Sequence, residues 1–265
     1  MNRAREMPNI TPFWERLPQF FLFPFQGQNL ILLPLLSLSS LLAIPFPLPT
    51  PVDYFMVEAL ILLAIVRRGF TVMDAISRGY LTGESQAVLL VDRERVNLPW
   101  KLLGVILLWG FVVDLAGTLG AALGWVCWLF TVVTLPAAVM ALSVTNSFAA
   151  GLNPLLWISI IRGIGKPYLV LLFFLALLSG GTPAAMPLLA PFLRGWLALP
   201  LLNFTVLYFT LIMFAMMGYV LYQFHGMLGL PIDRIPETPA NTPSRDAVGD
   251  EIAACLANGN IVGAL

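Results

Sequence analysis

Long apolar stretches alternate with shorter polar segments along almost the whole chain. A membrane-spanning helix needs roughly 20 mostly apolar residues. Six stretches fit or approach this length: 30–48, 54–66, 98–119, 122–144, 168–178 and 197–224. The pattern predicts an all-α, polytopic membrane bundle of about six transmembrane helices with interfacial amphipathic helices.

Two of the six stretches are short. The stretch 54–66 extends to Phe70 only if Arg67 and Arg68 reach an interface, where long basic side chains can snorkel to water. The stretch 168–178 continues into 180–191, which is apolar but rich in Gly and Pro and is interpreted as an outer loop. Five spans plus a re-entrant segment is the alternative.

The basic residues orient these spans. With the N-terminus inside, six spans place 13 of the 14 Lys and Arg residues on the inner side, and only Arg194 outside. Such an asymmetry is typical of the positive-inside rule. We therefore expect a multi-pass protein of a bacterial inner membrane, with both the N-terminus and the C-terminus cytoplasmic.

An amphipathic segment precedes each of three expected helical hairpins. Ser, Thr or Asn before a helix, and Pro at its first position, are helix-start signals. We predict three interfacial helices and a unit of interfacial helix, span and span repeated three times: Thr11-Pro12 opens 13–23, Thr71 with Asp74 opens 72–80, and Asn153-Pro154 opens 155–164. Gly120 and Gly124 fall between two spans and predict a tight hairpin there rather than a dimerisation motif.

The amino-acid composition also indicates that most of the protein surface faces lipid. The 265 residues are 59% hydrophobic and 11% charged, with a mean hydropathy of +0.87, whereas soluble domains carry about 25% charged residues. Lys+Arg and Asp+Glu are 14 each, so the charge gives no reason to expect a nucleic-acid partner. The expected organisation is a cytoplasmic N-terminus with an interfacial helix, a transmembrane domain, a Pro-rich linker and a cytoplasmic amphipathic tail, at 1–29, 30–230, 231–243 and 244–265.

The tail carries an apolar stripe at helical spacing: Val248, Ile252, Cys255 and Leu256. One short helix cannot bury such a stripe by itself. We expect these residues either to bind a partner or to belong to a longer chain that continues into a cytoplasmic helical domain.

Two carboxylates fall inside the apolar stretches, Asp114 and Glu58. Ionisable side chains within a bilayer are costly and are candidates for function. The expected topology places both in the outer half of the membrane, on the side of Arg194. The favoured interpretation is a structural pairing or hydration at the outer interface, and an ion or proton site is the alternative.

The chain shows no pattern of catalysis or metal binding. No nucleophile has a base at a known spacing, no glycine-rich phosphate loop is present, and His225 is the only histidine. We expect no enzyme activity, no cofactor and no metal. The predicted function is a non-enzymatic membrane scaffold or accessory subunit that binds membrane lipid, a protein partner or a second copy. The alternative is a small transporter or channel component that uses Asp114 and Glu58.

Four short sequences in the chain are similar to those of a known group of membrane proteins. They are Thr11-Pro12-Phe13-Trp14, Arg78-Gly79-Tyr80, Gly151-Leu152-Asn153-Pro154, and Phe224-His225 with Leu228-Gly229-Leu230. In layout the chain resembles, over about residues 10–230, the bacterial six-helix membrane families grouped with Yip-type membrane proteins. The resemblance implies a role in membrane organisation or as an adaptor and brings no site residues. The tail is shorter than the soluble extension of some members.

Overall fold

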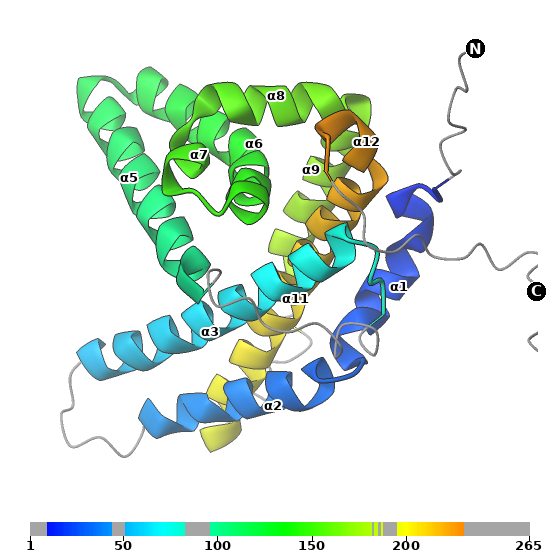
Figure 1. Ribbon diagram of the computed structural model, residues 1–265. Helices are drawn as coiled ribbons and strands as arrows, with labels where there is room; N and C mark the ends of the chain where they lie inside the picture. The colour runs from blue at the N-terminus through cyan, green and yellow to red at the C-terminus, as the bar shows by residue number, and fades with distance from the viewer. Residues whose placement is uncertain are drawn as a thin grey trace, which may run out of the picture. The chain divides into compact units, whose positions relative to one another are not determined.

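A computed structural model describes residues 10–43, 51–82, 96–181, 183–184, 187 and 195–230. Every described residue belongs to one compact unit, Met1–Arg234. All regular structure among these residues is helical, which confirms the all-α class (Figure 1). Arg194 and the tail residues Val248, Ile252, Cys255 and Leu256 lie outside the described residues.

The described residues form α-helices and short 3-10 helices, the latter labelled η. In chain order they are η1 (Phe13–Arg16), α1 (Leu17–Leu22), η2 (Phe23–Phe25), α2 (Asn29–Ser39), η3 (Ser40–Ala43), α3 (Pro51–Ser77), α5 (Leu98–Leu119), α6 (Ala121–Thr145), α7 (Phe148–Leu152), α8 (Pro154–Ile164), α9 (Lys166–Ser179), η5 (Gly195–Leu197), α11 (Ala198–Gln223) and α12 (His225–Leu228).

Within this part of the chain, three helices are long and apolar enough to cross a membrane, namely α5, α6 and α11. Two bent pairs raise the number to five if each pair is one span: Phe13–Phe25 with Asn29–Leu42, bent by 62°, and Pro154–Ile164 with Lys166–Ser179, bent by 105°. These helices are compatible with a membrane location. The stretch 54–66 lies in α3, whose charged residues keep it out of this set, so six spans are not confirmed.

Two of the three expected interfacial segments begin as predicted. Asn153 accepts a hydrogen bond from the backbone N–H of Leu155 at 3.0 Å, and Pro154 occupies the first turn of α8. Pro12 precedes η1, although Thr11 makes no side-chain cap. The sharp bends after these segments fit helices that lie along the membrane surface before the chain turns into it.

The prediction of a separate interfacial helix at 72–80 is wrong. Thr71 does not start a helix but lies inside α3, where its hydroxyl donates to the carbonyl oxygen of Arg67 at 3.1 Å. Asp74 forms an ion pair with Arg78 at 3.2 Å, one turn on in the sequence, rather than capping Thr71. The threefold repeat therefore fails at its second unit, because α3 continues to Ser77.

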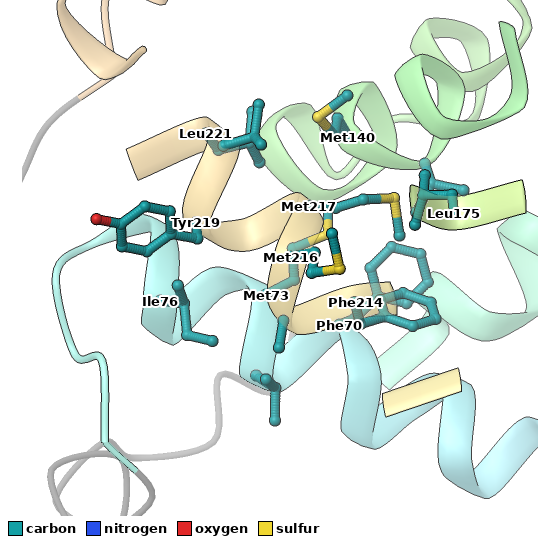
Figure 2. Packing of buried hydrophobic residues seen from close by; sticks show 14 of the residues in the cluster. Phe70, Met73, Ile76, Met140, Leu175, Phe214, Met216, Met217, Tyr219 and Leu221 are labelled. Carbon is teal, nitrogen blue, oxygen red and sulfur yellow. The ribbon is translucent and has the colours of Figure 1, made fainter. Parts of the chain in front are cut away.

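The centre of the core is α11, which is buried along almost its whole second half. Its main neighbour is α3, and the two helices touch where Gly218 lies against the backbone of Met73. Phe70 and Phe214 meet edge to face beside them, with ring centroids 5.2 Å apart (Figure 2). Methionines from α3, α6 and α11 fill the surrounding space: Met73, Met140, Met216 and Met217.

The N-terminal segment, residues 11–25, is hydrogen-bonded to α11 at several points. The hydroxyl of Tyr219 donates to the carbonyl oxygen of Thr11 at 2.7 Å, and that of Tyr208 donates to Phe21 at 2.9 Å. The backbone N–H of Phe13 donates to Oε1 of Gln223 at 3.1 Å, and the Phe13 ring is fully buried. Tyrosines on the last long helix thus hold the first helical segment in place.

Helices α5 and α6 form the tight hairpin that the glycines predicted. The chain reverses at Gly120, and a Cβ added to Gly124 would lie 2.9 Å from the Cα of Gly117, so the two backbones are in contact. At the base of the hairpin, Lys101 Nζ donates to Oδ1 of Asn146 at 3.0 Å. Near the turn the apolar side chains are mostly exposed, including Leu119 at 76% and Trp125 at 68%.

Candidate functional site

Glu58 is held by a partner that the sequence analysis did not single out. Its Oε1 accepts a hydrogen bond from Nδ2 of Asn203 at 2.8 Å, which joins α3 to α11. Both side chains are partly buried. This bond supports the interpretation of Glu58 as a structural residue, because its carboxylate already binds within the helix pair.

We expect Asn203→Leu to lower the free energy of unfolding in detergent by about 0.5–2 kcal/mol, the range measured for hydrogen bonds between membrane helices. The reason is that the Glu58 carboxylate loses its amide donor at a partly buried position. Thermal unfolding of the purified protein measures the change. The double variant Glu58→Leu/Asn203→Leu should recover part of the loss, since it leaves no unpaired carboxylate. A double variant less stable than Asn203→Leu would contradict the pairing.

Asp114 lies elsewhere, on an exposed face of α5. It lines an open cavity of about 660 Å³ between the two arms of the hairpin, together with Trp125 and Trp128. The two indole rings stand nearly perpendicular, at 82°, with centroids 5.5 Å apart. Gly117 and Gly124 form part of the wall. A Cβ at Gly117 would meet nothing within 4 Å, so the absent side chain of Gly117 helps to leave this space open.

The structure does not bring the two carboxylates together. The described residues that line the Asp114 cavity come from α5 and α6 and include no basic side chain, whereas Glu58 is bonded to α11. Within the described ranges, no hydrogen bond or ion pair to the Asp114 side chain is present. Arg194, which the expected topology places on the same side of the membrane as the two carboxylates, is outside those ranges.

A second polar site, between α2 and α3, was missed. A groove of about 450 Å³ has polar residues at one end, Gln28, Arg67, Arg68 and Thr71, and apolar residues at the other, Ile31, Leu32, Leu35 and Ala64. Two of the polar residues are arginines, and the part of the chain that the structure describes places no carboxylate in the groove lining.

Arg68 is anchored by a buried amide. Its Nε donates to Oδ1 of Asn29 at 2.8 Å, and its Nη1 lies 3.5 Å from Oε1 of Gln28. Asn29 is 0% exposed, and its Nδ2 has no hydrogen-bond partner among the described residues. A signal for this contact exists in the sequence, because Asn29 lies 16 residues before the proline-rich segment 45–51 and Arg68 lies 17 residues after it. Residues so placed face each other in an antiparallel helical hairpin.

The remaining candidate, His225, lies beside the end of α11, where its Nδ1 is 2.8 Å from the carbonyl oxygen of Tyr222. In the described part of the chain, no group of three His, Cys, Asp or Glu residues is placed to hold a metal ion.

No protein-family model matches the chain, and no curated protein or solved structure shows detectable similarity to it. The resemblance to Yip-type families therefore stays a prediction.

Proposed function

We propose that this chain is a scaffold or accessory subunit of a bacterial inner membrane, with six spans and both ends in the cytoplasm. In this proposal the α5/α6 hairpin binds a helix of another membrane protein. The observation that carries the proposal is the Asp114 carboxylate, which faces away from the core of its own chain and has no described partner.

Lipid satisfies the apolar side chains of the hairpin but not this carboxylate. Asp114 lies five residues before the end of α5, about 8 Å along the helix axis, which is too deep for a short side chain to reach water easily. Ionisable residues in spans generally face a bundle interior or pair with another polar group. A partner helix with a basic or amide side chain beside Asp114 supplies that group, and Trp125 and Trp128 add aromatic contact area.

The alternative, a transporter that uses Asp114 and Glu58, needs both carboxylates on one aqueous path. Their positions on different helix pairs, and the bond between Glu58 and Asn203, give it less support. Loss of ion flux in both Asp114→Asn and Glu58→Gln variants would favour it.

We expect Asp114→Leu to reduce the amount of co-purified partner about tenfold or more, equivalent to at least 1.4 kcal/mol of binding free energy. The tagged native-length protein is extracted in mild detergent, and its stoichiometric partners are quantified by mass spectrometry. A photo-crosslinking amino acid at position 128 should capture the same partner, and capture should fail in Asp114→Leu.

Glu58→Gln is the matched control, because it alters a carboxylate that is already bonded inside the chain. It should leave partner recovery unchanged. Crosslinks only to a second copy of the chain would replace the proposed partner by a homodimer. An unchanged partner yield in Asp114→Leu would contradict the proposed site.

A further inference from the structure

The groove between α2 and α3 has the charge of an anion-binding site. Arg67 and Arg68 contribute two positive charges, and none of the described residues that line the groove is acidic. The Arg67 side chain is exposed and makes no ion pair or hydrogen bond within the described part of the chain. Arginine guanidinium groups bind phosphate oxygens through several parallel N–H donors, which makes a phosphate a well-matched ligand.

One of these arginines is already held in position. Arg68 uses its Nε for the bond to the buried Asn29, and this bond fixes the plane of the guanidinium. A guanidinium has five N–H donors, so donors remain for a ligand. Thr71 follows Arg67 by four residues and Arg68 by three, so its side chain lines the same face of α3, with its hydroxyl proton donated to the carbonyl oxygen of Arg67.

The opposite end of the groove is apolar. From Gln28, the residue before α2, to Leu35 on α2, and from Thr71 to Ala64 on α3, the lining runs seven residues, or about 10 Å along each axis. Over this distance it changes from charged to purely hydrocarbon. Ala64 keeps the far end open because its side chain is small. A free phosphate would fill only the polar end, whereas a phospholipid matches both ends.

We propose that this groove binds one anionic phospholipid of the inner leaflet, with its headgroup phosphate between Arg67, Arg68, Gln28 and Thr71. One acyl chain lies along Ile31, Leu35 and Ala64. The inner-leaflet assignment rests on the orientation in the proposed function, but the groove itself is independent of the hairpin and its partner. Basic grooves between membrane helices on the cytoplasmic side are suited to anionic headgroups.

The test is native mass spectrometry of the full chain in detergent, titrated with phosphatidylglycerol or with phosphatidylcholine. We expect one phosphatidylglycerol to bind in preference to phosphatidylcholine. Arg67→Gln should weaken that binding about fivefold, which corresponds to about 1 kcal/mol for one basic residue. Arg67 is the first choice because no described contact in the fold depends on its side chain.

Arg162→Gln is the matched control. Arg162 is an exposed basic residue at the end of α8, outside the groove, and its loss should leave the affinity unchanged. Equal weakening by the two variants would overturn the proposal, because it would indicate general electrostatic attraction. Equal binding of the two lipids would overturn it too.

Two further measurements distinguish binding of a lipid from binding of a free anion. Ala64→Leu narrows the apolar end and should weaken phosphatidylglycerol binding, while millimolar inorganic phosphate should not displace the lipid. Displacement by phosphate, together with an unaffected Ala64→Leu variant, would assign the site to a free anion and refute the lipid. Asp114→Leu should bind the lipid normally, so a failure of the proposed partner site would be distinguishable.

Discussion

Replacing Gly218 by leucine is expected to prevent the chain from folding, and even Gly218→Ala should lower the free energy of unfolding by about 1–3 kcal/mol. A Cβ at this position would lie 2.8 Å from the carbonyl oxygen and 2.9 Å from the Cα of Met73. Both are backbone atoms, so no side-chain rotation can relieve the overlap. The α3 and α11 helices would have to separate along the best-packed interface of the core.

Gly110→Ala is the control for this experiment. Gly110 also lies inside a long helix, α5, but a Cβ there would meet nothing within 4 Å. The variant should be as stable as the original chain or up to about 1 kcal/mol more stable, since alanine favours the helix. Thermal unfolding in detergent and the monodisperse fraction in size-exclusion chromatography measure both variants. A Gly218→Ala protein with unchanged stability would contradict the close approach of α3 and α11.

We expect Trp157→Ala to lower the free energy of unfolding by about 3–5 kcal/mol, the range for truncating a buried large aromatic side chain. The Trp157 ring is 2% exposed and lies 5.3 Å from the ring of Trp109 and 6.4 Å from that of Phe130. These contacts attach α8 to the α5/α6 hairpin. We therefore expect α8 to detach at lower temperature than the rest of the chain, detected as protease cleavage near Asn153.

Leu155→Ala changes a neighbouring position on α8 whose side chain is 75% exposed. It should leave the unfolding temperature and the cleavage pattern nearly unchanged, because no core contact is lost. If Leu155→Ala and Trp157→Ala behaved alike, α8 would be held by its immersion in the membrane surface rather than by the aromatic cluster.

The local features of the fold were predictable from the sequence where one short signal determines the backbone. Asn153 followed by proline gives a helix start, and Gly120 gives the reversal between α5 and α6. Thr71 was misread because its hydroxyl can bond either to a following N–H as a cap or to a preceding carbonyl within a helix. The packing of Phe70 and Met73 on α11 decides for the continuous helix, and such a contact is invisible along the sequence.

In the candidate sites, too, the local features were predictable from the sequence and the contacts between helices were not. A charged residue in an apolar run is evident, so Asp114 and Glu58 could be named in advance. Their surroundings depend on which helices meet. Asn203 was missed because a single amide in a long apolar helix has no periodic pattern, and Asn29 because its partner is a residue of the next helix.

The hydrogen bonds between the N-terminal segment and α11 also determine when that segment can pack during synthesis, because α11 is made much later. Phe13 and Gln223 are 210 residues apart in the chain, and at about 5–20 residues per second the ribosome needs roughly 10–40 s to cover that distance. Throughout this time the rings of Phe13, Phe20 and Phe23 lack the helix that buries them. A nascent chain that stops before α11 would therefore keep an unburied aromatic segment, which is a feature that membrane quality-control proteases can detect.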